Sequence, residues 1–326
     1  MARKKITGDG KTSKEYWKLR EEELKHIKED MKKDAAYKNQ LTKLYNLAQE
    51  EIEKDIAKDI ENFARKEEIS IVEARKRIKK MDVENFAERA KKMVEDKDFS
   101  DEANKQLREY NVTMRTNRLE LLQAKMNLNT VKLANQEEHM LQRYLAKIFI
   151  EEYTRQAGIL NLSVPSNKQL ENMAKSFVEA EFRNVTFSDN IWQNQKELQE
   201  GLENALRRSI LRGENPRVTG SRLRKLVKEE FEKKKYAADR IAITESARVQ
   251  GEAQKVSFKD GGFEKYTWIS EPGACDICKP LDGKIFKIKD MGDNAPALPQ
   301  HPFCRCSTAA YVDRAEWDKR LKERGL

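Results

Sequence analysis

The chain has 326 residues, which is enough for about two domains of ordinary size. Apolar residues make up only 38% and charged residues 37%, which excludes one compact core and favours elongated helices with exposed faces. The net charge of +9 would suit a phosphate-bearing partner such as DNA, but acidic and basic residues alternate along most of the sequence, as on solvated helices.

The sequence shows neither a secretory signal nor a membrane span. The N-terminal stretch MARKKITGDG is basic, but no apolar run follows it. The most apolar stretch, YLAKIFI at 144–150, is far shorter than the roughly 20 residues that a span needs. We therefore expect synthesis in a reducing cytoplasm and no membrane partner.

The first half of the chain is predicted to be helical, because residues 11–157 contain neither Gly nor Pro. A single rod would be roughly 220 Å long, so several helices are expected. Capping boxes at Thr12 with Glu15 and at Ser70 with Glu73 mark two starts, and Asp82 and Ser100 are weaker ones.

Two apolar stripes with helical spacing predict helix packing, within the chain or against a partner. The first stripe is Leu41, Leu44, Ala48, Ile52, Ile56, Ile60 and Phe63. The second is Leu119, Leu122, Met126, Leu133, Met140, Tyr144 and Ile148.

The first break in composition, GILNLSVPSNK at 158–168, indicates a domain boundary. We expect a charged helical region over 1–160 and a second domain over 161–326. Helices resume with Ser188 and Ser221 as expected N-caps, and the Gly-rich 260–262 ends this helical part.

Short strands are predicted at 263–270, 284–288 and 307–312, where aromatic and branched residues gather. The dipeptide Asp282-Gly283 is typical of a tight turn. The expected fold class is therefore α+β: an elongated helical region, then a helix-and-small-sheet domain with a β subdomain over 263–313.

All four cysteines of the chain, and one of its three histidines, lie in this subdomain. Clustered thiols in a reducing compartment point to metal binding or catalysis before disulfides. Two half-sites, C-x-x-C and H-x-x-C, have the spacing of a tetrahedral zinc site. A tetrahedral ion needs four ligands, and we favour Cys275, Cys278, His301 and Cys304. Cys306 is the substitute if one of these four does not bind.

The alternative is that the thiols pack a small sheet without metal, or serve redox chemistry. If zinc binds, protein ligands close the site, so the zinc is structural. Motifs of catalytic zinc, nucleic-acid deaminases, phosphate-binding loops and nucleophile elbows do not occur in the sequence, and His26 and His139 are expected at the surface. We therefore predict that the protein is not an enzyme and has no small-molecule substrate.

A basic patch precedes the cysteines, on an expected helix, the turn after it and the start of the next helix. Such a cluster can grip a phosphate backbone without reading sequence, although polar helices carry arginines in any case. Its members are Arg207, Arg208, Arg212, Arg217, Arg222, Arg224, Lys225 and Lys228.

The order of features in the C-terminal half resembles the Mu F-like head morphogenesis domain of tailed-phage minor head proteins. The resemblance rests on RIAITESARVQGEAQ, YTWIS, CDICKPLDGKIF and HPFCRCSTAAYV, and covers about 188–313. Arg240, Thr244 and Glu245 match the helix motif of the family, while Ile243 stands where an arginine is common.

The resemblance implies a virion component on the inside of the phage head near the portal, made in the host cytoplasm. Its expected partners are the portal protein, other head proteins and, without sequence specificity, DNA. The implied role is head assembly and DNA packaging or delivery. A nucleic-acid-binding zinc protein is the alternative.

Overall fold

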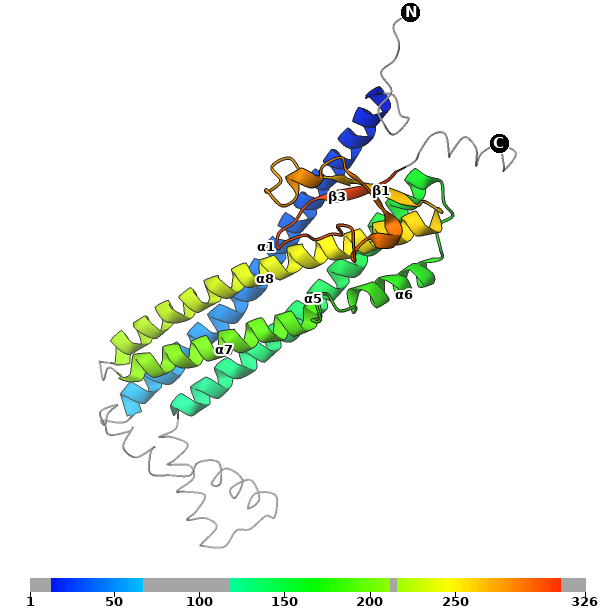
Figure 1. Cartoon of the computed structure of the whole chain (residues 1–326). Helices are drawn as coiled ribbons and strands as arrows, with labels where there is room; N and C mark the ends of the chain where they lie inside the picture. The colour runs from blue at the N-terminus through cyan, green and yellow to red at the C-terminus, as the bar shows by residue number, and fades with distance from the viewer. Residues whose placement is uncertain (1–12, 67–117, 212–215, 312–326) are drawn as a thin grey trace, which may run out of the picture. The chain divides into compact units, whose positions relative to one another are not determined.

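The computed structural model describes residues 13–66, 118–211 and 216–311 (Figure 1). The helix starts expected at Thr12, Ser70, Asp82 and Ser100 lie outside these ranges. The helices are α1 Ser13–Lys66, α5 Arg118–Leu160, α6 Asn167–Val178, α7 Phe187–Leu211 and α8 Pro216–Asp260. The strands are β1 Lys265–Ile269, β2 Ile285–Lys287 and β3 Ser307–Tyr311, with the short 3-10 helices η1 Lys279–Leu281 and η2 Ile288–Asp290. The predicted class, a mainly helical α+β protein, is confirmed.

Two predicted helix caps are wrong. Thr186, not Ser188, caps α7: its hydroxyl accepts a hydrogen bond from the Asp189 N–H (3.1 Å), and its own N–H donates to the Asp189 carboxylate (3.0 Å). Ser221 lies inside α8, which already begins at Pro216, a residue well suited to the first turn because it has no N–H to satisfy.

The chain divides into two compact units: residues 1–42, 137–191 and 236–326 form unit 1, and residues 43–136 and 192–235 form unit 2. Each unit takes segments from both sides of residue 160, because α1, α5, α7 and α8 each contribute to both units. The expected domains 1–160 and 161–326 stay a prediction.

The described part of unit 2 consists of four helical segments. Tyr45 is fully buried at its centre, where its ring meets Phe231 edge-on with the centroids 6.3 Å apart. The Tyr45 hydroxyl accepts hydrogen bonds from the amides of Asn194 (3.2 Å) and Gln195 (2.8 Å). This polar contact fixes α7 against α1 inside an otherwise apolar core.

The first apolar stripe is largely confirmed, since Leu41, Ala48, Ile52 and Ile56 are buried. The second holds only in its first half. Beyond Leu133 the residues Leu141, Leu145 and Phe149 are buried in place of the predicted positions, each of which lies one residue earlier and is half-buried. Polar residues interrupt the apolar pattern of this helix, so the sequence did not indicate the one-residue shift in its buried positions.

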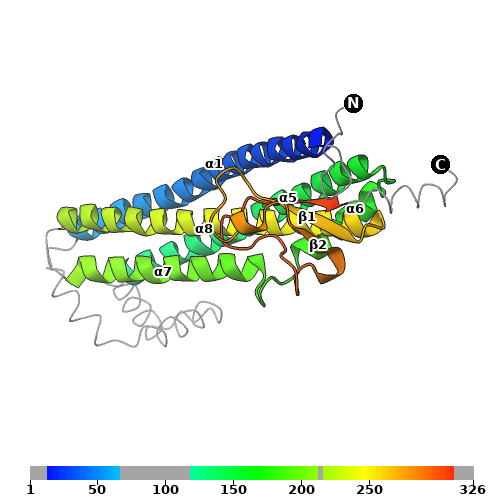
Figure 2. The ribbon, with the colours of Figure 1, turned by 45° about the horizontal axis from the view of Figure 1, so that its top comes forward.

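Unit 1 combines parts of α1, α5, α7 and α8 with α6 and a three-stranded antiparallel sheet of order β2-β1-β3 (Figures 1 and 2). Tyr266 lies opposite Phe286 on one side and Ala310 on the other. Trp268 and Tyr266 project from the same face of β1 and are fully buried. They anchor the two apolar clusters that surround the cysteines and the end of α8.

The two edges of the sheet differ. The Gln254 side chain from α8 covers β3, because its Oε1 accepts hydrogen bonds from the N–H (3.1 Å) and the hydroxyl (2.6 Å) of Thr308. Among the described residues no strand pairs with the outer edge of β2, which is short and bears the exposed Lys287, features that discourage further pairing. None of the described helices combines the length and apolar character needed to cross a membrane.

Candidate metal centre

The first half-site is a turn that follows β1. The carbonyl of Cys275 accepts hydrogen bonds from the N–H groups of Cys278 (3.1 Å) and Lys279 (2.9 Å), which closes the turn. Closing it brings both thiols to the same side, with Cys275 exposed and Cys278 buried. The sequence C-D-I-C is long enough for this turn and no longer, so the spacing predicted the local geometry.

The second half-site lies in the loop before β3. The N–H of Cys304 donates to the carbonyl of His301 (3.2 Å), so this H-x-x-C segment also turns back on itself. Phe303 takes a left-handed conformation (φ 63°) inside the turn. Cys304 and Cys306 are both buried against Trp268.

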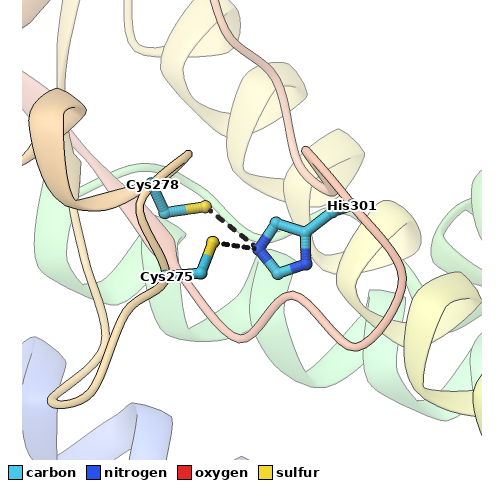
Figure 3. Close-up of side chains that lie close together, drawn as sticks. All are labelled: Cys275, Cys278 and His301. Carbon is cyan, nitrogen blue, oxygen red and sulfur yellow. Dashed lines mark hydrogen bonds between the residues drawn. The ribbon is translucent and has the colours of Figure 1, made fainter.

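The two half-sites face each other. The Nε2 atom of His301 lies 3.0 Å from the Cys275 sulfur and 3.3 Å from the Cys278 sulfur (Figure 3). The sulfurs of Cys278 and Cys304 are 3.9 Å apart. In each of the trios Cys275–Cys278–His301 and Cys278–Cys304–Cys306 the possible ligand atoms lie within 4.8 Å of one another.

These separations fit a tetrahedral ion. Zinc bonds of about 2.3 Å to sulfur and about 2.0 Å to nitrogen place two sulfurs about 3.8 Å apart, and a sulfur and a nitrogen about 3.5 Å apart. The distances found here agree with those edges to about half an ångström. The cluster can therefore hold a metal ion with little rearrangement.

The imidazole of His301 is held in an orientation suited to a ligand. Its Nδ1 lies 2.7 Å from the Pro302 carbonyl oxygen, which can only accept a hydrogen bond. This contact places the proton on Nδ1 and leaves the lone pair of Nε2 directed at the thiols. A backbone partner of this kind commonly orients a metal-binding histidine.

The thiols influence one another's protonation. A hydrogen bond from Cys306 lowers the pKa of Cys304 to about 5, while the same contact raises the pKa of Cys306 above its usual range. Burial raises the pKa of Cys278 to about 12. The N–H of Cys278 lowers the pKa of Cys275. A cation bound among the sulfurs would release protons, so its affinity would rise with pH.

Residues 200–309 match the family model described as Phage Mu protein F like protein. This confirms the resemblance predicted for the C-terminal half. The matched segment is about a third of the chain, and it includes all five candidate ligands. No curated protein and no solved structure matches the chain.

The helix motif of the Mu F-like segment has structural contacts. The Thr244 hydroxyl donates to the carbonyl of Arg240 (2.6 Å) and lies 3.4 Å from the N–H of Phe303, in the H-P-F-C turn. The buried Glu245 accepts a hydrogen bond from Arg248 (2.7 Å). Arg248 in turn donates to the carbonyls of Phe177 and Val178 at the end of α6. The motif thus joins α8 to the cysteine loop and to α6.

The basic patch predicted between 207 and 228 lies at the end of α7 and the start of α8, in unit 2. Arg208 is exposed and donates to the Asn204 carbonyl (3.2 Å), and Lys225 and Lys228 are exposed as well. Arg224 donates to Ser221 (3.3 Å), and Arg222 is half-buried. The side chains of Arg207, Arg212 and Arg217 lie outside the described part of the chain.

Sequence reasoning missed a buried ionic cluster in unit 1. His26, expected at the surface, has a side chain only 12% exposed, and its Nε2 lies 2.9 Å from a Glu152 carboxylate oxygen. Arg155 bonds both Glu152 (2.8 Å) and Glu23 (2.7 Å). His139 is exposed, as expected. No local signal could have found this cluster, because Glu23, His26 and Arg155 look in sequence like residues of a solvated helix face.

Proposed function

We propose that the chain is a structural minor head protein of a tailed phage, associated with the portal and active in head assembly and DNA packaging or delivery. The observation that carries the proposal is the Mu F-like match over 200–309, which includes the whole cysteine and histidine cluster. The protein would lie inside the head near the portal, with other head proteins as partners.

We infer a scaffolding rather than an enzymatic role. Five protein donors are available for four positions around a tetrahedral ion, which leaves none for a substrate or an activated water. A closed site of this kind stabilises a fold. The donors lie in loops that join the three short strands of a small sheet, so a metal staple would add to its stability.

We propose zinc as the metal, held by Cys275, Cys278, His301 and Cys304. The short contacts of His301 with both thiols of the first half-site favour it over Cys306 as the fourth ligand. Cys306 would then remain a thiol that donates a hydrogen bond to Cys304, a supporting role outside the coordination sphere.

Elemental analysis of the pure, reduced protein should find about one zinc per chain. Cys278→Ser and His301→Ala should lose the metal, and near-ultraviolet circular dichroism should report a loosened environment of Trp268. Cys306→Ser should keep the metal, and His139→Ala is the matched histidine control. If Cys306→Ser loses zinc while His301→Ala keeps it, the site has four cysteine ligands.

The assembly role is tested by removing the gene from the phage genome. We expect heads that fail to become infectious, and co-purification of the chain with a portal oligomer when both are produced together. Normal infectious particles without the protein would contradict the proposal.

We also propose that DNA contacts the basic patch, because Lys225 and Lys228 are exposed there. Arg224→Glu with Lys228→Glu should weaken binding to any duplex and flatten its salt dependence. Lys259→Glu with Lys289→Glu, which changes the net charge equally elsewhere, should do less. Equal loss in both double variants would mean that only the overall charge matters.

A further inference from the structure

The segment that carries the cysteines is tied to helix α1 by ion pairs at both ends. Near the first half-site, Arg20 of α1 pairs with Asp282 at 2.5 Å. The other oxygen of the Asp282 carboxylate accepts a hydrogen bond from the N–H of Ser270 (2.9 Å), at the end of β1. Asp282 therefore links α1 to the turn that follows Cys278.

At the second half-site, Arg305 pairs with Asp34 of α1. Asp34 is only 6% exposed, and it also accepts hydrogen bonds from the hydroxyls of Tyr144 (2.6 Å) and Ser246 (3.2 Å). One carboxylate of α1 thus gathers α5, α8 and the cysteine loop. A buried carboxylate of this kind depends on its cationic partner, because an uncompensated buried charge is costly.

Arg305 stands between two of the thiols. Cys304 and Cys306 both belong to the apolar cluster around Trp268, whereas the Arg305 side chain reaches α1. The two thiols flank Arg305 in the chain, so fixing both of them also restricts the direction of the guanidinium. Residues 304–306 are in neither helix nor strand, so regular backbone pairing does not hold them.

A third contact follows directly after the last cysteine. The buried Ser307 hydroxyl donates to the carboxylate of Glu23 on α1 (3.2 Å). Glu23 also accepts a hydrogen bond from Arg155 of α5 at 2.7 Å. Along its length in unit 1, α1 therefore contacts the cysteine segment through Arg20, Glu23 and Asp34.

We propose that the docking of α1 is controlled by metal at the cysteine cluster, with Arg305 as the coupling residue. When a metal fixes Cys304, the adjoining backbone is held and Arg305 is directed at Asp34. When the metal leaves, the loop loses the cross-link between its two half-sites, the ion pair loosens and α1 is held less tightly. This inference rests on the proposed metal site. Through this coupling, loss of the metal at the cysteines would expose the surface of α1.

Hydrogen–deuterium exchange of the full chain tests the proposal, with metal content measured on the same samples. Removing the metal with a chelator under reducing conditions should speed amide exchange in α1 between residues 20 and 37 by about tenfold or more, since loss of one buried ion pair exceeds the energy of a tenfold change. Peptides from 192–206 in unit 2 should change little and serve as the internal reference.

Arg305→Met separates the coupling from general unfolding of the sheet. This variant should keep its metal and the protection of β1, but show fast exchange in α1 before any chelation. Arg183→Met is the matched control, because the hydrogen bond described for Arg183 runs to the Gln300 carbonyl (3.4 Å) of the same loop and not to α1. It should leave α1 exchange unchanged.

The outcomes distinguish the two proposals. A chain that binds no metal overturns both. A chain that binds metal but shows the same α1 exchange with and without it overturns the coupling and leaves the metal site standing. Metal-dependent α1 exchange that Arg305→Met does not reproduce would also overturn the assigned role of Arg305.

Discussion

Gly251 allows the loop before His301 to lie directly against α8. A Cβ atom built on Gly251 would lie 2.8 Å from the Cβ of Leu298, closer than real side chains approach. Leu298 belongs to the apolar cluster that includes three of the cysteines. The absence of a side chain at 251 therefore positions the second half-site.

We expect Gly251→Ala to destabilise the protein by about 1–3 kcal/mol, the usual cost of overpacking. Gly158→Ala, in α5, is the control: no atom lies within 4 Å of the added methyl group, and the change should stabilise the helix by about 0.5–1 kcal/mol. Urea unfolding measures both. Shifts of the same sign in the two variants would contradict the argument.

At the level of elements, Glu152 joins three helices. Its carboxylate accepts hydrogen bonds from Gln254 of α8 (2.8 Å) and Arg155 of α5 (2.8 Å), and it contacts His26 of α1. Burial raises the pKa of Glu152, but His26 and Arg155 outweigh burial and bring the pKa well below its ordinary value. The charged form is thus part of the folded state.

Because a buried pair depends on both members, Arg155→Met should destabilise unit 1 by about 3 kcal/mol. The variant leaves the carboxylates of Glu23 and Glu152 without their main partner. Lys147→Met, which removes an exposed pair with Glu151 on the same helix, should cost less than about 0.5 kcal/mol. Thermal unfolding of the two variants measures the difference.

The contact between His26 and Glu152 is sensitive to pH, because the imidazole can gain or lose a proton. Burial alone lowers the pKa of His26, but the hydrogen bond and charge of Glu152 raise it above the ordinary value, with Asp30 adding to the rise and Arg155 opposing it. Its stabilising effect is therefore complete below about pH 6.5 and is lost as the pH rises through the raised pKa.

The free energy of unfolding, measured against pH in the wild type and in His26→Gln, should differ most below about pH 6.5 and converge above the raised pKa. Nearby Glu23 stays in both proteins, and because the charge of His26 is the smallest of the influences on its pKa, most of its titration is common to the two. A constant difference across this range would show that the imidazole charge is not involved.

At the level of the whole molecule, the Mu F-like segment relies on residues outside it. Gln254 and Arg305 lie within 200–309, but their partners Glu152 and Asp34 do not. These contacts are made by charged or polar groups that are largely buried, so water cannot replace a lost partner without a cost in free energy.

We therefore expect residues 200–311 produced alone to lack cooperative unfolding even with zinc present, whereas the full chain should unfold in a defined transition. Circular dichroism during heating tests this. A fragment that melts cooperatively, with native-like near-ultraviolet signals, would show that α1 and α5 are dispensable for folding.

Local signals determined much of this protein. The absence of Gly and Pro over 11–157 predicted the long helices, and the spacing of Cys275, Cys278, His301 and Cys304 predicted two facing half-sites. Both depend on residues a few positions apart, where backbone geometry alone sets the outcome. The ligand choice and the DNA contacts stay predictions.

Tertiary structure alone decided what lies far apart in the chain. The burial of His26 follows from Glu152, which is 126 residues away, and the partner of Arg305 is a helix near the N-terminus. This chain has many charged residues. In the sequence, those that form buried ion pairs cannot be told apart from those that face water. Packing selects among them, because only buried charges must find partners.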